Sequence, residues 1–170
     1  MSGIGATPVS PVDVEAAIRE FVASEYPRVV AAVGHATGQA DAAEDAVQDA
    51  LIKVLADGHR PRRLAAWVTV VAINVLHARH RRSRAEERAT RRMEQAPADD
   101  AASGVPERVA VLEAVNRLPE GQRVAVLLHY YLDAAVADIA TALGVSEGTV
   151  KTQLHRGRRA LAAVLGEEET

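Results

Sequence analysis

Residues 136–156, with the sequence VADIATALGVSEGTVKTQLHR, decide the fold of the C-terminal part of this chain. Their apolar members recur at helical spacing and predict one compact interior, made of Ile139, Leu143, Val145, Val150 and Leu154. Gly144 stands where a tight turn requires a positive φ, and Ser146 is placed to cap the next helix. Ala140 is small where two helices would cross. Together these residues predict a helix-turn-helix.

The second helix of that motif predicts a DNA-reading surface, because motifs of this kind place their second helix in the major groove. Its polar residues face away from the apolar stripe, and a basic group continues toward the C-terminus. The residues expected to contact duplex DNA are Glu147, Gly148, Thr149, Lys151, Thr152, His155, Arg156, Arg158 and Arg159. The alternative interpretation is a helical hairpin with a solvated, charged face.

The composition of the whole chain favours helices and excludes several kinds of site. Its 170 residues are 48% hydrophobic but only 3% aromatic, and alanine-rich sequence without β-branched alternation favours helix over sheet. The chain has no cysteine, which excludes disulfides, thiolate metal sites and a cysteine nucleophile. We find neither the ~18 apolar residues of a membrane span nor a secretory signal, so we expect a soluble, cytoplasmic protein without a membrane partner.

Turn and cap signals divide the chain into two groups of helices. Predicted helices begin at Pro11 and then cover residues 28–36, 41–55, 64–82, 107–117, 120–132, 136–143 and 147–164. We therefore expect an all-α fold of two small helical domains joined by a flexible linker, the C-terminal one a helix-turn-helix. The expected segments are a disordered N-terminus at 1–10, a first domain at 11–88, the linker at 89–105, a second domain at 106–165 and an acidic tail at 166–170.

The predicted helix at 41–55 separates acidic from apolar residues. Asp41 and Glu44 have the spacing of a capping box at its start. Its inner face is expected to comprise Val47, Leu51, Val54 and Leu55, and its outer face Asp41, Asp45, Gln48 and Asp49. A solvated acidic surface and a docking surface for a basic protein both fit this pattern.

The formal net charge of −3 hides strong segregation of charge along the chain. The predicted helix at 64–82 runs into a basic segment, where residues 77–92 hold arginines at 79, 81, 82, 84, 88, 91 and 92. Such a run suits a phosphate backbone. His77 and His80 lack an evident third ligand, so we expect no metal site. Without a nucleophile, a metal set or a phosphate-binding loop, the chain is not expected to be an enzyme or to need a cofactor.

Four stretches of this chain resemble one family. They are residues 41–54 (DAAEDAVQDALIKV), 64–74 (LAAWVTVVAIN), 118–127 (LPEGQRVAVL) and 148–159 (GTVKTQLHRGRR). On these stretches the chain resembles the extracytoplasmic-function sigma factors, which are two-domain members of the sigma superfamily. The resemblance covers about residues 16–85 and 106–165, and it implies an RNA polymerase subunit that directs promoter recognition and transcription initiation.

The resemblance also implies partners and site residues. Core RNA polymerase would be bound through the clamp helices of its largest subunit by Glu44, Asp45, Gln48 and Asp49, with the C-terminal domain near the β flap. Promoter DNA would be read as a −35 duplex by the helix-turn-helix and as a −10 element by the N-terminal domain. The residues implied for the −10 element are His59, Arg60, Arg62, Arg63, Trp67, Asn74, His77, Arg79, His80 and Arg81. Many relatives are held by an anti-sigma factor, but no residue here identifies one.

Several positions depart from the family pattern. Members of the family commonly have aromatic and basic residues after the tryptophan, where this chain has Thr69, Val70 and Ile73. In the predicted helix at 41–55, Leu51 and Leu55 stand where the family often has aromatic residues. Because unstacking a base costs a few kcal/mol, these changes indicate either an unusual −10 sequence or a greater dependence on the −35 contact. Two other functions stay open: a stand-alone helix-turn-helix regulator, and a sigma-like protein–protein module that no longer melts promoters.

Overall fold

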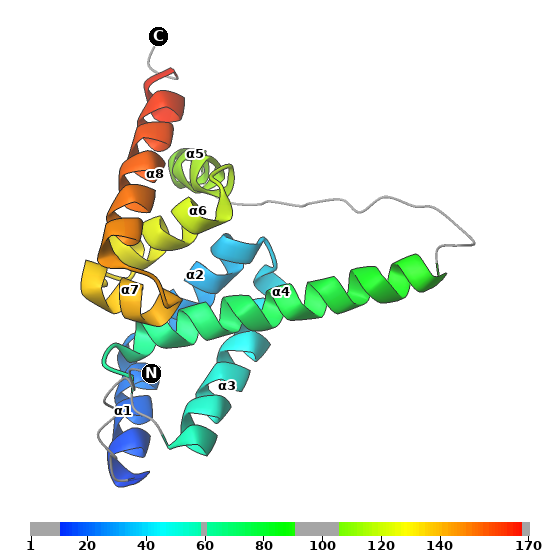
Figure 1. The fold of residues 1–170 in the computed structure, drawn as a ribbon, viewed down its shortest axis with the longest axis vertical. Helices are drawn as coiled ribbons and strands as arrows, with labels where there is room; N and C mark the ends of the chain where they lie inside the picture. The colour runs from blue at the N-terminus through cyan, green and yellow to red at the C-terminus, as the bar shows by residue number, and fades with distance from the viewer. Residues whose placement is uncertain (1–10, 59–60, 91–105, 168–170) are drawn as a thin grey trace.

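The computed structural model describes residues 11–58, 61–90 and 106–167, and these residues form helices joined by short turns, without strands. The all-α prediction is therefore confirmed for this part of the chain. In order, the elements are α1 (Pro11–Ser24), α2 (Tyr26–Thr37), α3 (Ala40–Asp57), α4 (Leu64–Thr90), α5 (Pro106–Asn116), α6 (Glu120–Val126), the π-helical turn η1 (Leu127–Tyr131), α7 (Val136–Leu143) and α8 (Glu147–Glu167). Figure 1 shows α1–α4 as an N-terminal half and the later elements as a C-terminal half.

The N-terminal half packs α2, α3 and the first part of α4 against one another, with α1 alongside. Helix α1 ends at Ser24, and α2 begins at Tyr26, two residues before the predicted start at 28, with proline in its first turn. The expected capping box is wrong: α3 begins at Ala40 after Gln39, which makes no side-chain cap. Asp41 lies instead in the first turn, where its charge favours the helix dipole.

Helix α4 is longer than its apolar pattern. Residues that pack in the core, such as Val68, Ala72 and Leu76, recur only as far as the middle of the helix. Beyond them, every residue from 79 to 90 is exposed, and α4 protrudes from the body of the molecule (Figure 1). The helix continues to Thr90, two residues into the segment expected as linker, whose residues 91–105 lie outside the described part.

The C-terminal half surrounds α8. The expected turn at Gly144 is confirmed with φ of 67°, and the amide of Thr149 donates to Ser146 Oγ at 3.1 Å, as predicted for the cap. Gly157 lies where α8 crosses α6, and a Cβ there would come within 2.8 Å of Val126 Cγ2. Only glycine therefore permits this close approach without displacement of a neighbour. Nothing in the apolar periodicity singles out Gly157.

Two expected core residues are exposed. Leu55 near the end of α3 is 49% exposed and Val145 in the turn before α8 is 41% exposed, so neither belongs to the interior. Leu55 is the residue after the buried Val54, so its side chain points to a different side of α3. Val145 belongs to the turn between α7 and α8, which no further helix covers in the described structure. The remaining expected residues of the two apolar stripes are buried or half-buried.

The two halves contact each other directly. Helix α2 contacts η1, α5 and α6, while the first part of α4 contacts α7. Buried residues of both halves form one continuous apolar cluster, which includes Val29 and Val33 from α2 and Leu128 and Ile139 from the C-terminal half. Polar contacts also join the halves, between Arg28 and Asp133, between Arg62 and Asp138, and between His77 and Glu120. The sequence pattern did not indicate that the halves would pack together.

Candidate functional site

The first turns of α8 present the residues expected to contact duplex DNA. All nine of these residues are exposed, while Val150 and Leu154 on the opposite side are buried. The predicted division of this helix into an apolar and a polar face is therefore confirmed. Lys151 Nζ lies 3.8 Å from Glu147 Oε2, one turn away, which leaves both groups at the surface. The geometry provides a solvent-facing helix whose basic residues extend from Lys151 to Arg159.

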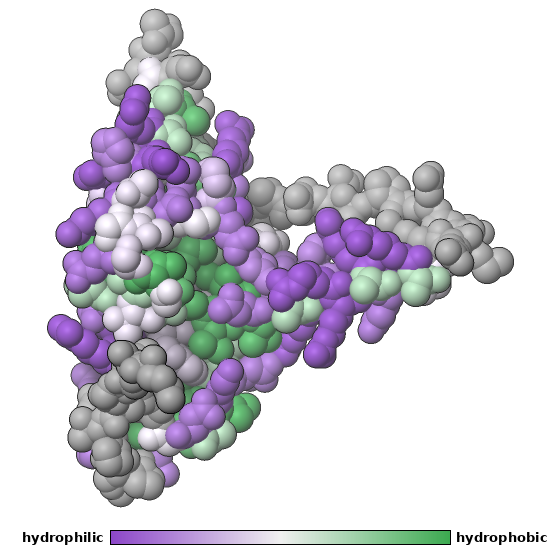
Figure 2. Space-filling view, viewed as in Figure 1, coloured by the Kyte–Doolittle hydropathy of each residue, from purple (hydrophilic) through white to green (hydrophobic). Residues whose placement is uncertain are grey.

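The protruding part of α4 forms a second basic surface. Arg81, Arg84 and Arg88 lie three and four residues apart, so they share one face of the helix, whereas Glu86 lies on the opposite side. Figure 2 shows this part of the molecule as largely hydrophilic. Like charges at such spacing destabilise an isolated helix by about 0.2–0.5 kcal/mol per pair.

The residues expected to bind the −10 element are divided between free surface and internal contacts. Asn74, His80 and Arg81 are exposed, and Trp67 is half-buried beside the core. The side chains of Arg62, Arg63, His77 and Arg79 make polar contacts within the molecule. His59 and Arg60 lie outside the described residues. Among the eight described residues, Arg63, Trp67 and His77 are partly covered, whereas Arg62 and Arg79 remain exposed beside their partners.

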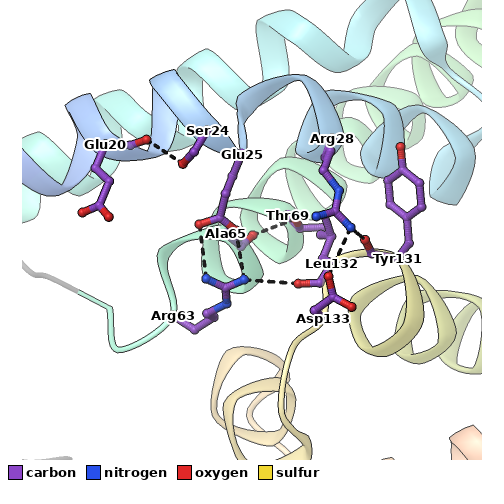
Figure 3. Close-up of polar contacts among 10 residues, drawn as sticks. All are labelled: Glu20, Ser24, Glu25, Arg28, Arg63, Ala65, Thr69, Tyr131, Leu132 and Asp133. Carbon is purple, nitrogen blue, oxygen red and sulfur yellow. Dashed lines mark hydrogen bonds and ion pairs between the residues drawn. The ribbon is translucent and has the colours of Figure 1, made fainter.

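Three of the internal contacts reach the C-terminal half. Arg62 Nε lies 3.3 Å from Asp138 Oδ1 of α7, and His77 Nδ1 lies 3.2 Å from Glu120 Oε1 of α6. Arg63 pairs with Glu25 at 2.9 Å and also donates to the carbonyl of Leu132 at 3.2 Å (Figure 3). The expected −10 side chains thus serve as partners for acidic side chains and a carbonyl.

The acidic face of α3 is open. Glu44, Asp45, Gln48 and Asp49 are all exposed, and Asp49 forms an ion pair with Arg79 of α4. The hydroxyl of Tyr26 donates to Glu44 Oε1 at 3.2 Å and accepts from Gln48 Nε2 at 3.3 Å. Tyr26 therefore holds two of the four side chains in position. The local sequence pattern does not indicate this role.

The departures from the family pattern on α4 are core positions in this structure. Thr69, Val70 and Ile73 are all buried, and Thr69 Oγ1 donates to the carbonyl of Ala65 at 2.7 Å. A long basic side chain at Val70 or Ile73 would lose its hydration in this arrangement, which is costly without a partner. The small and apolar residues at these positions are therefore suited to the packing observed.

The described residues show neither a metal centre nor a membrane span. Among them, no group of three or more histidine, aspartate or glutamate side chains is arranged to hold a metal ion. No helix within these residues combines the length and the apolar character required to cross a membrane.

Comparison with known proteins shows two matches along the chain. Residues 21–86 match the family model for sigma-70 region 2, and residues 108–161 match the model for sigma-70 region 4. The ECF RNA polymerase sigma factor SigM of Mycobacterium tuberculosis is 36% identical over 104 residues, which cover 61% of this chain and 52% of SigM. SigL of the same species is 33% identical over 127 residues, covering 68% of this chain and 66% of SigL.

A solved structure has a similar fold. The sigma factor RpoE from Bartonella quintana, crystallised in complex with the anti-sigma factor NepR, matches with a TM-score of 0.69 and 25% sequence identity. The match covers 89% of this chain and 98% of the matched chain. By contrast, this chain spans between about half and two thirds of the length of the curated relatives named above.

Proposed function

The chain belongs to the extracytoplasmic-function branch of the sigma-70 superfamily, and from this membership we propose that it is an RNA polymerase sigma factor that directs transcription initiation at particular promoters. The observation that carries the proposal is that regions 2 and 4 occur in one chain, each with an exposed charged surface suited to its role. The acidic surface belongs to the N-terminal half and the basic recognition helix to the C-terminal half.

Docking to core polymerase is assigned to the acidic face of α3. Glu44, Asp45, Gln48 and Asp49 are exposed side by side, and carboxylates of this kind attract a basic partner surface. Tyr26 reduces the side-chain freedom of Glu44 and Gln48 before binding, which lowers the entropy lost on association. The partner assigned to this face is the clamp-helix region of the largest polymerase subunit, with region 4 near the β flap.

Promoter reading is assigned to two surfaces. The exposed side of α8 enters the major groove of the −35 duplex, where Lys151, Arg156 and Arg158 contribute base or phosphate contacts. The N-terminal half engages the −10 element with the arginines and histidines around α4, and the arginine face formed by Arg81, Arg84 and Arg88 follows the phosphate backbone. Since polymerase holds the subunit in place, a formal net charge of −3 is compatible with DNA binding.

The deciding experiment is co-elution of the purified chain with bacterial core RNA polymerase, with and without a competing housekeeping sigma factor. Formation of a complex that the competitor displaces supports the proposal. Asp45→Lys is expected to weaken the complex, whereas Asp57→Lys, at the end of the same helix and outside the acidic face, leaves it intact. Absence of any complex, together with tight binding of the free chain to duplex DNA, would favour a stand-alone regulator instead.

A regulatory partner of the anti-sigma class forms part of the same proposal. The similarity to RpoE, which was solved with NepR, extends over most of this chain and supports such a partner. Competition between that partner and core polymerase for one chain is the expected behaviour.

Promoter melting is tested separately: a permanganate footprint that shows unpaired thymines near −10 would exclude a module that has lost melting.

A further inference from the structure

The arginine face of α4, formed by Arg81, Arg84 and Arg88, points away from the acidic face of its own chain. At 3.6 residues per turn, these side chains lie about half a turn around the helix from Arg79, which is the arginine that pairs with Asp49 of α3. All three are exposed, and none of them makes an ion pair or a side-chain hydrogen bond with another described residue. The arginine face therefore finds no partner among the described residues of its own chain.

Helix α3 presents a face of the opposite charge. One line of exposed residues runs along it at helical spacing, consisting of Asp41, Asp45, Gln48 and Ile52. Glu44 and Asp49 flank this line, and Ile52 at its end is 62% exposed. The ion pair between Asp49 and Arg79 shows that this face binds an arginine of α4. A basic helix is therefore complementary to it.

The two faces match in length. The exposed end of α4, residues 79–90, and the line from Asp41 to Ile52 each comprise twelve residues, which is about 18 Å of helix at 1.5 Å per residue. Arginines at spacings of three and four residues then meet carboxylates at similar spacings. Ala85 lies on the same side as Arg81 and Arg88, and its small side chain allows two helices to approach closely.

We propose that the arginine face of one molecule binds the acidic face of a second copy of this chain, so that the protein self-associates head to tail. Helix α3 and the exposed end of α4 diverge from the body of the molecule (Figure 1), so a chain makes these two contacts with two different copies. Such a contact joins unlike surfaces and leaves one arginine face and one acidic face open in a dimer. The association does not depend on the proposed function, but its consequence does: a second copy and core polymerase compete for the acidic face.

The association is weak and depends on salt. Each ion pair between exposed side chains contributes little, and a contact of one helix with another buries less area than a stable dimer requires. Because salt screens exposed charges, raising sodium chloride from about 50 mM to about 500 mM is expected to weaken self-association roughly tenfold. Self-association through apolar surfaces would not weaken in this way.

Sedimentation velocity of the full chain, freed of nucleic acid, measures the association at several protein concentrations. A triple alanine chain, in which the arginine face is removed, is expected to associate roughly tenfold more weakly, because three exposed ion pairs are lost. Its substitutions are Arg81→Ala, Arg84→Ala and Arg88→Ala. Alanine favours helix, so circular dichroism should show that helicity is retained.

The matched control removes the same charge from another helix. It carries three substitutions of exposed arginines on α8, namely Arg156→Ala, Arg158→Ala and Arg159→Ala. This α8 control has the same net charge as the triple alanine chain, and it should associate like the unaltered chain because its arginines lie outside both faces.

Mixing two variants tests the pairing of the faces. Asp41→Asn together with Asp45→Asn removes two carboxylates from the acidic face and leaves the arginine face intact. This chain and the triple alanine chain are each expected to be monomeric at concentrations where the unaltered chain associates. When mixed, they should form a dimer with one copy of each and nothing larger, because only one complementary pair of faces remains.

The outcomes separate self-association from the proposed function. An unaltered chain that is monomeric at low salt, an α8 control that weakens as much as the triple alanine chain, or a mixture that forms no dimer would each overturn the pairing of these faces. A chain that stays monomeric but co-elutes with core polymerase leaves the sigma-factor assignment in place. A chain that associates as described but does not bind core polymerase overturns the assignment alone.

Discussion

The two surfaces assigned to DNA differ in their contacts within the molecule although both are rich in basic residues. On α8, Lys151, Arg156 and Arg158 are exposed, and Lys151 lies near Glu147 of the same helix. Around the start of α4, Arg62 and Arg63 contact the C-terminal half, and the Arg62 side chain is 83% exposed whereas that of Arg63 is 34% exposed. Local sequence settles which residues face solvent on a single amphipathic helix. It does not settle whether a distant part of the chain covers them, because that depends on packing between elements.

Truncation of the core of the C-terminal half has the largest expected effect. Ile139→Ala removes a fully buried side chain, and we expect a loss of about 2–5 kcal/mol in the free energy of unfolding. Because the buried cluster is continuous across both halves, urea unfolding followed by circular dichroism should show one transition at lower urea. Val145→Ala, at a position that is largely exposed, is the control and should change stability by less than about 0.5 kcal/mol. Two separate transitions would show that the halves are energetically independent.

Overpacking at the crossing of α8 and α6 has the second largest expected effect. Gly157→Leu forces its side chain into Val126, so we expect destabilisation of about 1–3 kcal/mol and loss of duplex DNA binding. Gly166→Leu, on the same helix with no atom near its Cβ position, serves as the matched control. Thermal unfolding of both variants measures the difference. Equal stability of the two would mean that the close approach at Gly157 is not required.

Removal of the cap of the recognition helix has a smaller effect. Ser146→Ala leaves the amide of Thr149 without its side-chain acceptor and is expected to cost about 0.5–2 kcal/mol. Ser146→Asn retains a capping oxygen and should preserve most of the stability. Both are compared by urea unfolding. If Ser146→Asn loses as much stability as Ser146→Ala, the stabilising interaction is the hydroxyl contact between Ser146 and Thr149 rather than the cap.

Single arginine substitutions test the contrast between the two surfaces most directly. Their expected effect on the free energy of DNA binding is the smallest of these changes. Arg156→Ala removes one exposed cation from α8 and should reduce the slope of log affinity against log salt by ~0.9 for duplex DNA. Arg62→Ala should reduce that slope by less, because Arg62 is paired with Asp138 although its side chain is 83% exposed. Fluorescence anisotropy at several salt concentrations measures both variants. Equal reductions would show that Arg62 is already available to DNA.

Particular residues show how far the sequence could be interpreted. Gly144 and Ser146 carry local backbone and capping preferences, and their predicted roles are confirmed. The capping box at Asp41 is wrong, because α3 begins one residue earlier and the capping position is occupied by Gln39. Leu55 was predicted to be buried from its apolar character, but periodicity does not show where the neighbouring helices stop covering α3.

The expected site residues show the same contrast between local features, which the sequence predicts, and contacts between distant residues, which it does not. The exposed faces of α3 and α8 follow from the alternation of apolar and charged residues, which sequence displays directly. Tyr26, Glu25 and Arg28 were not expected to hold site residues or to join the halves. Their partners lie between 18 and 105 residues away in the chain, and no local pattern signals contacts of such separation.

The sequence by itself determined the helices, their apolar stripes, the turn at Gly144 and the charge of each surface, because these depend on backbone preferences and on periodicity within a few residues. The tertiary structure alone decided that the two halves close on one another, that Arg28 and Arg63 cap the end of η1, and that Gly157 must lack a side chain. Such features arise from distances between elements that are remote in sequence, and each is set by packing as a whole rather than by any one segment.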